Sequence, residues 1–258
     1  MVGTIAALGR MTISFVRQLG AMTIFAADIV IATLNPPLRM RQLLDELYKL
    51  GVLSLVIITV CGLAVGMVLG LQGYNTLVRF GAEEALGAVV GLSLIRELGP
   101  VLTALLATGR AGSATTAEIG TMVATEQLDG LRMMSVDPID YVIKPKAQAM
   151  LFVMPLLSAL FVVAGLGGGY VVGVALMGID AGTYVSSLEN SIDFGNDVAG
   201  CMLKAVVFGL IVGLISTYRG YTSQPTSAGV SSATTSTVVT ASVAILISDY
   251  FITALWGV

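Results

Sequence analysis

Four ionisable residues lie inside otherwise apolar stretches of the chain and are the first candidates for chemistry: Arg96, Glu97, Lys204 and Asp249. Charged side chains in such stretches are costly, so they are usually paired or functional. The chain has no histidine, which excludes a Ser-His-Asp or Cys-His nucleophile and any histidine-ligated metal site. The sequence also has no cluster of acidic residues that predicts a metal site. We therefore expect no catalytic residue and no metal site, and an enzyme is disfavoured.

These residues must be positioned by helices that cross a membrane. Only 11% of the 258 residues are charged and 56% are hydrophobic, whereas an ordinary soluble domain is about 25% charged. Backbone groups in lipid must be paired within their own segment, and these apolar runs are too long and uniform for barrel strands. We predict an all-α integral membrane protein with about five transmembrane helices, at residues 50–78, 85–109, 147–179, 198–218 and 232–258.

Basic residues predict the orientation of these helices, because cytoplasmic loops carry an excess of lysine and arginine. One side of the predicted membrane holds Arg10, Arg17, Arg39, Arg41, Lys49, Arg110, Arg132, Lys144, Lys146 and Arg219. The other side holds Arg79 alone, and its 180–197 loop is acidic, with Asp180, Glu189, Asp193 and Asp197. The N-terminus is therefore predicted to be cytoplasmic and the C-terminus to lie outside.

Residues 1–49 are predicted to form an amphipathic helix in the membrane interface, followed by a helical elbow that leads into the first span. Apolar residues recur at spacings of three and four, as on one face of a helix: Leu8, Met11, Phe15, Leu19, Met22, Phe25 and Ile29. Asn35-Pro36-Pro37 ends this helix. The alternative is a short sixth span whose two arginines reach the interface. Residues 50–258 are assigned to the transmembrane domain.

Glycines at every fourth position predict close helix packing in the first span. Gly62, Gly66 and Gly70 lie on one face of the predicted helix. The same spacing recurs at Gly169/Gly173 and Gly209/Gly213. Small residues let helix backbones approach closely in lipid, where the hydrophobic effect does not drive association. The pattern does not identify the partner helix.

The depths of Lys204 and Asp249 in their spans predict that the two residues pair. Lys204 lies roughly 9 Å and Asp249 roughly 13 Å from the outer end of its span, at 1.5 Å per residue. Glu97 lies somewhat deeper, at roughly 18 Å, and can join them, with Arg96 turned about 100° away. The favoured interpretation is a buried clamp between helices. The alternative is a charged wall that gates the substrate path or contacts a phosphate group.

Residues 125–136, between the second and third spans, are predicted to form a short amphipathic helix on the cytoplasmic side. Leu128, Leu131 and Met134/Ser135 recur on one face. The charged residues of a neighbouring face are Glu126, Asp129 and Arg132. Such a helix could dock into a groove on a cytoplasmic motor, with apolar side chains filling the groove and charges fixing the register. A solvated loop helix without a partner is an equally good interpretation of the pattern alone.

The densest signature in the chain lies within residues 95–146. It consists of Arg96-Glu97-Leu98-Gly99-Pro100-Val101-Leu102-Thr103, Gly109-Arg110-Ala111-Gly112, Ala117-Glu118-Ile119-Gly120-Thr121-Met122, Thr125-Glu126-Gln127-Leu128-Asp129 and Asp137-Pro138. These residues closely resemble the signature of the MlaE/YrbE family, the permease subunits of ABC transporters that move phospholipids and related lipids. Gly130 and Ser135 depart from it, because the family is expected to have alanine and glycine there.

The resemblance implies a homodimer in the bacterial inner membrane, with the C-terminus in the periplasm. Its implied partners are a cytoplasmic ABC ATPase of the MlaF type, a STAS-domain protein of the MlaB type and a hexameric MCE-domain protein of the MlaD type. The complex would carry phospholipid along the periplasmic MCE pathway and maintain outer-membrane lipid asymmetry. The chain has no G-x-x-x-x-G-K-[ST] phosphate loop, so ATP and magnesium are expected to bind the separate ATPase. We expect no cofactor in this chain and no nucleic-acid partner.

A substrate cavity is predicted at the homodimer interface, near the outer ends of the first and second spans. Its predicted lining residues are Leu69, Leu77, Val78 and Leu98, which are apolar and lie in the outer halves of those spans. The alternative for each is that it simply faces lipid.

A transporter driven by an ion gradient is the second functional hypothesis. Its ion relay would be Glu97, Lys204 and Asp249, because ionisable groups inside spans are by default functional candidates. Five spans without an evident internal repeat argue against it.

Overall fold

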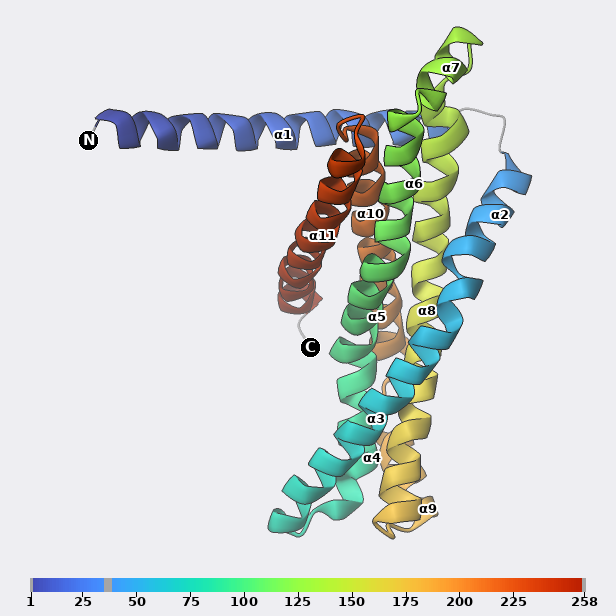
Figure 1. The fold of residues 1–258 in the computed structure, drawn as a ribbon. Coiled ribbons are helices and arrows are strands. Elements are labelled where there is room, and N and C mark those ends of the chain that lie inside the picture. Colours follow the sequence, from blue (N-terminus) through green and yellow to red (C-terminus); the bar gives the residue numbers. More distant parts are fainter. Residues whose placement is uncertain (1, 35–38, 257–258) are drawn as a thin grey trace.

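The computed structural model describes residues 2–34 and 39–256, and every regular element within them is a helix (Figure 1). The α-helices are α1 (Val2–Leu34), α2 (Met40–Leu50), α3 (Leu55–Leu77), α4 (Leu86–Ser93), α5 (Gly99–Ala107), α6 (Ser113–Ala124), α7 (Gln127–Met133), α8 (Lys144–Tyr170), α9 (Ala181–Ser191), α10 (Ala199–Tyr221) and α11 (Ser227–Trp256). Short 3₁₀ and π-helical turns join several of them into longer rods.

Six helical segments among the described residues are long and apolar enough to cross a membrane. They are Val16–Thr33, Met40–Phe80, Glu83–Ala124, Ile139–Leu176, Phe194–Tyr221 and Ser227–Leu255. The last five coincide with the five predicted spans, although the third and fifth of them end at Leu176 and Leu255, three residues before the predicted ends. The prediction of an all-α, multi-pass membrane protein is therefore confirmed. The predicted elbow is α2, whose residues Leu43 and Leu47 pack against the main core cluster.

The remaining segment, Val16–Thr33, belongs to helix α1, which lies across one end of the bundle instead of alongside the other helices (Figure 1). Phe25 and Ile29, two of the predicted apolar positions, are buried, and the Phe25 ring lies 5.5 Å from that of Tyr218 in α10. The side chains of Leu8, Met11, Phe15 and Leu19 are outside the described part of the structure. This crosswise placement favours the interfacial helix over the sixth span, and a position in the membrane interface stays a prediction.

The second span is longer than its predicted range of 85–109, because the helix continues through α6 to Ala124. The polar residues of this segment predict a loop, but neighbouring helices supply hydrogen-bond partners for them. The Thr116 hydroxyl lies 3.0 Å from both the Ser216 carbonyl oxygen and the Thr237 hydroxyl. Arg110 donates to Ser54 Oγ at 2.6 Å. Hydrogen bonds from other helices therefore allow a polar sequence to remain helical inside the bundle.

Helix α8 is the partner of the glycine ladder in α3. A Cβ atom on Gly66 would lie 1.8 Å from the Gly165 carbonyl oxygen, and one on Gly62 would lie 2.7 Å from the Phe161 oxygen. Nearer its N-terminal end α8 meets α10, where a Cβ on Gly209 would lie 3.0 Å from the Met150 oxygen. Glycine is thus required where two backbones touch, and the predicted close packing is confirmed within one chain.

Candidate functional site

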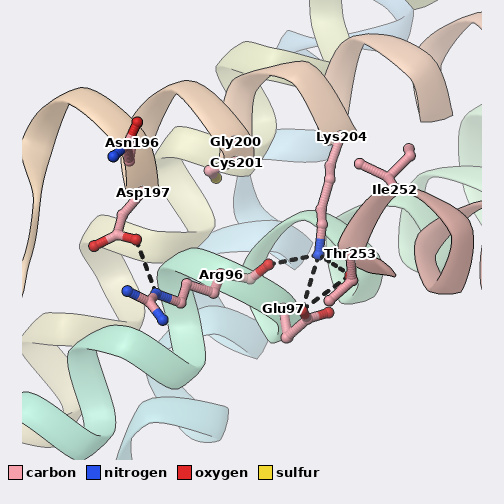
Figure 2. Close-up of a pocket in the computed structure, with 9 residues that line it drawn as sticks. All are labelled: Arg96, Glu97, Asn196, Asp197, Gly200, Cys201, Lys204, Ile252 and Thr253. Carbon is pink, nitrogen blue, oxygen red and sulfur yellow. Dashed lines mark hydrogen bonds and ion pairs between the residues drawn. The ribbon is translucent and has the colours of Figure 1, made fainter. Parts of the chain in front are cut away.

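The predicted intramembrane charges meet where α4, α5, α10 and α11 approach one another. Figure 2 shows three of the four, Arg96, Glu97 and Lys204. A π-helical turn, Leu94–Leu98, separates α4 from α5 and carries the adjacent residues Arg96 and Glu97. Such widened turns are frequent at functional sites in helices. Figure 2 shows the two side chains diverging, with Arg96 reaching toward Asp197 and Glu97 toward Lys204.

Lys204 of α10 is the centre of the larger half of this cluster. Its buried Nζ lies 3.0 Å from Glu97 Oε1 and 3.1 Å from Asp249 Oδ1. The ammonium also donates to the Arg96 carbonyl oxygen and to Thr253 Oγ1, both at 2.8 Å. The Asp249 contact is an ion pair without hydrogen-bond geometry. Electrostatic attraction, and not a directional hydrogen bond, therefore holds this carboxylate.

Arg96 and Asp197 form the smaller half. Arg96 Nε donates to Asp197 Oδ1 at 2.8 Å, and the Asp197 side chain is almost fully buried. Asp197 lies in the π-helical turn Phe194–Val198 that opens α10, and its second oxygen accepts the Asp193 backbone N–H at 2.9 Å. This hydrogen bond fixes the carboxylate that receives the guanidinium.

The size and charge of the cluster favour a clamp between helices over an anion pocket. The hollow that it lines is about 20 Å³, room for about one water molecule and not for a lipid head group. Two cations face three carboxylates, so the five charges sum to −1. Pairing lowers the cost of placing each charge inside a span. These observations agree with the favoured interpretation from the sequence.

The predicted pairing of Lys204 with Asp249 is confirmed, and Glu97 joins the pair as expected. Asp197 and Thr253 belong to the same cluster but were not predicted. Asp197 had been assigned to an acidic outer loop, and only the continuation of α10 by a π-helical turn buries it. Thr253 lies one turn after Asp249 on α11, and side chains four residues apart share a helix face. This spacing could have identified Thr253 as a member of the cluster.

The four predicted cavity residues do not meet at the charged cluster. Leu69, Leu77 and Leu98 are half-buried against the main core, and Val78 is exposed. None of the four lines the hollow around Lys204. Their role in lining a lipid cavity stays a prediction.

The predicted cytoplasmic helix is present as α7, but it is shorter than residues 125–136. Glu126 and Ser135 have left-handed backbones, with φ of 57° and 60°, and they end the helix on either side. Asp129 Oδ1 and Arg132 NH1 form an exposed ion pair at 2.7 Å. Glu126 therefore lies at the bend between α6 and α7, while Asp129 and Arg132 lie on the helix itself.

The predicted apolar face of α7 points into its own bundle. Leu128 is buried in a cluster with Phe25 and Ile29 of α1, and Leu131 packs against that cluster. Met134, the third predicted position of that face, is exposed, as is its neighbour Met133 at 89%. Leu128 is therefore not available to fill a partner's groove, and that part of the prediction was wrong, while a docking role for Leu131 and Met134 stays a prediction.

Together, the fold and the site define a multi-pass helical membrane protein whose intramembrane charges are paired between helices. Comparison with known sequences assigns its family. The sequence model described as permease MlaE matches residues 43–255. The chain belongs to the MlaE permease family.

Three relatives show the breadth of this similarity. The intermembrane phospholipid transport system permease protein MlaE of Haemophilus influenzae is 48% identical, over 99% of this chain and 98% of that protein. A probable ABC transporter permease protein of Rickettsia bellii is 41% identical over 96% of both chains. The chloroplastic protein trigalactosyldiacylglycerol 1 of Arabidopsis thaliana is 33% identical over 91% of this chain and 67% of its own length.

Proposed function

We propose that this chain is the permease subunit of an ABC transporter that moves phospholipids between the inner membrane and a periplasmic MCE-protein pathway, maintaining outer-membrane lipid asymmetry. The Haemophilus relative, named for phospholipid transport and similar along almost the whole chain, supports this proposal. The proposed partners are an ABC ATPase of the MlaF type, a STAS-domain protein of the MlaB type and a hexameric MCE protein of the MlaD type. ATP and magnesium bind the ATPase. The proposed orientation has a cytoplasmic N-terminus and a periplasmic C-terminus, as the distribution of basic residues predicts.

One structural observation carries the proposal that the working unit is a homodimer. Arg96 and Glu97 lie inside an apolar span, yet their side chains are 38% and 42% exposed in the single chain. Charged groups that face lipid are strongly disfavoured and normally face a bundle interior or a water-filled cavity. A second copy that covers this face, with a hydrated lipid path between the two copies, removes the unfavourable exposure.

Lipid is expected to enter that path beside Leu69, Leu77, Val78 and Leu98. A photoreactive amino acid at each of these positions should label phospholipid more strongly than one at Leu156, an exposed position in the middle of α8. Labelling at the four positions that does not exceed the Leu156 control would contradict the proposed cavity.

Helix α7 is proposed to contact the ATPase through Glu126, Asp129 and Arg132. We expect the double reversal Glu126→Lys/Asp129→Lys to reduce ATPase co-purification at least about fivefold, because like charges across an interface cost several kcal/mol. The permease itself should stay folded, because an exposed ion pair such as Asp129–Arg132 contributes only about 0–1 kcal/mol. Each single charge reversal should reduce ATPase co-purification less than the double reversal does. Full ATPase binding with full transport in the double variant would place the docking site elsewhere.

Native mass spectrometry of the complex purified through this chain tests the proposed function directly. We expect two copies of the permease together with an ATPase, and extracted lipid dominated by glycerophospholipid. A chain that purifies alone and without bound phospholipid contradicts the proposal.

The second candidate function is a transporter driven by an ion gradient, and the cluster of Glu97, Lys204 and Asp249 is the observation that favours it. Buried ionisable groups that touch one another can relay protons. In this interpretation the chain would transport its substrate without an ATPase and would need an ion gradient. The first proposed function needs the ATPase and ATP instead.

A further inference from the structure

A second buried charge cluster joins three helices at the start of α8. Lys146 Nζ lies 2.9 Å from Glu46 Oε1 of α2 and 2.7 Å from Glu118 Oε2 of α6. Its side chain is only 3% exposed. The charge pattern predicts a loop position for Lys146, but the residue lies in the first turn of α8. There its ammonium group binds a carboxylate from each of two other helices.

Arg110 forms a second connection between the helix that contains α6 and the segment that contains α2. It lies about two turns before Glu118 on the continuous helix that becomes α6. Its NH1 group donates to the carbonyl oxygen of Lys49 at 3.1 Å and to Ser54 Oγ at 2.6 Å. These acceptors lie where α2 ends and the turn Val52–Ser54 leads into α3. Arg110 therefore ties the helix that continues into α6 to the α2–α3 junction, while Glu118 is tied to Glu46 of α2 through Lys146.

The two arms of the Lys146 bridge differ in their freedom to move. Glu46 is buried, whereas the Glu118 side chain is 40% exposed beside a cavity of about 250 Å³. Lys49 Nζ, at the edge of this cavity, lies 3.8 Å from Glu118 Oε1. All three bridge residues border this cavity, and Lys49 Nζ is also within reach of Glu46 Oε1, at 3.4 Å. The two arms differ in burial, because the Lys146 and Glu46 side chains are only 3% and 12% exposed, whereas Glu118 has space to move. Apolar residues often replace a buried ion pair without loss of stability, so stability alone does not explain the bridge.

Helix α6 leads along the chain from α5 to α7, and Glu118 lies about two turns before the bend at Glu126. We infer that the Glu118–Lys146–Glu46 bridge is a positioning device that carries a displacement of α7 to α2 and the first span during transport. This inference rests on the proposed function, because the displacement of α7 would come from ATP hydrolysis by the partner. Lys146 is its central positioning residue.

Glu118→Ala in the reconstituted complex tests the bridge, because it removes the α6 arm and leaves the buried Lys146–Glu46 pair intact. ATPase co-purification and ATP hydrolysis should stay within about twofold of wild type, while lipid transferred per ATP hydrolysed falls at least about fivefold, the lower end of typical coupling between sites. Thr121→Ala is the matched control on α6, because its exposed hydroxyl bonds only to the carbonyl oxygen of Ala117 in its own helix. It should leave the ratio unchanged.

Lys146 provides an independent second test. Lys146→Arg should retain the amount of lipid transferred per ATP hydrolysed, because arginine can still contact both carboxylates. Glu46→Gln/Lys146→Met removes the buried ion pair and should lower this ratio as Glu118→Ala does. A wild-type ratio in Glu118→Ala or in the Glu46/Lys146 variant overturns the inference. Parallel loss of hydrolysis and transfer also overturns it, because that is the signature of a merely structural role. Wild-type complex that transfers no lipid with ATP contradicts the proposed function itself, and is thereby distinguished from a failure of the bridge.

Discussion

Lys204→Glu is expected to abolish lipid transfer, with a loss of well over tenfold. The substitution places a third carboxylate beside Glu97 and Asp249, which now share the Lys204 ammonium at 3.0 and 3.1 Å. An unpaired charge in the centre of a span costs about 2.5–3.5 kcal/mol on insertion scales. Asp249→Lys should impair transfer for the converse reason, because it places two ammonium groups side by side. Transfer into acceptor vesicles, normalised to the amount of folded complex, is the measurement.

The double swap Lys204→Glu/Asp249→Lys decides whether the two residues act as partners. It restores the opposite charges across α10 and α11, so transfer should recover substantially relative to either single variant. Leu203→Met, at an exposed neighbouring position on α10, is the control and should be silent. If both single changes are silent, or if the swap is worse than either alone, the pairing with Asp249 carries no function. Glu97 then becomes the relevant partner of Lys204.

Gly66→Ala is expected to prevent α3 and α8 from packing. Its Cβ would lie 1.8 Å from the Gly165 carbonyl oxygen, and the Cβ of a Gly168→Ala variant would lie 2.2 Å from the Leu63 carbonyl oxygen. Overpacking typically costs about 1–3 kcal/mol. Here the obstructing atoms belong to backbone and not to a flexible side chain, so we expect the upper end or more. Thermal unfolding in detergent and the yield of monodisperse protein measure this loss.

Gly167→Ala is the matched control for the packing of α3 on α8. Gly167 is adjacent to Gly168 on the same helix, but a Cβ there meets no atom within 4 Å. Alanine is favoured over glycine inside a helix by about 1 kcal/mol, so this variant should be as stable as wild type or more so. Equal destabilisation by Gly167→Ala and Gly168→Ala would mean that close backbone contact does not explain the glycines.

The transmembrane helices and the central ion pair could be predicted from the sequence because lipid imposes simple rules. An apolar run must be helical and long enough to cross, and a lone charge at a given depth needs a partner at a similar depth. These rules located Lys204, Asp249 and Glu97. They failed for Asp197, because a carboxylate near the end of a span looks like a loop residue until the neighbouring turn buries it.

Contacts between distant segments could not be predicted from the pattern of single helices. Glu46 and Lys146 are separated by 100 residues along the chain, and each alone looks like an ordinary interfacial charge. Leu128 and Leu131 do share one face of α7, as predicted. Periodicity does not say whether such a face contacts a partner or the protein's own bundle. The buried cluster of Leu128 with Phe25 and Ile29 answers that question.

Reconstitution into liposomes tests most directly the central claim that this chain moves phospholipid as the permease of an ATP-driven transporter. Transfer of a labelled phospholipid is followed with the chain alone under an ion gradient, and with the complete complex supplied with ATP. The account predicts transfer only when the ATPase and ATP are present, with no dependence on the gradient. Gradient-driven transfer by the chain alone, lost when Glu97, Lys204 or Asp249 is neutralised, would contradict it and establish the ion-coupled transporter instead.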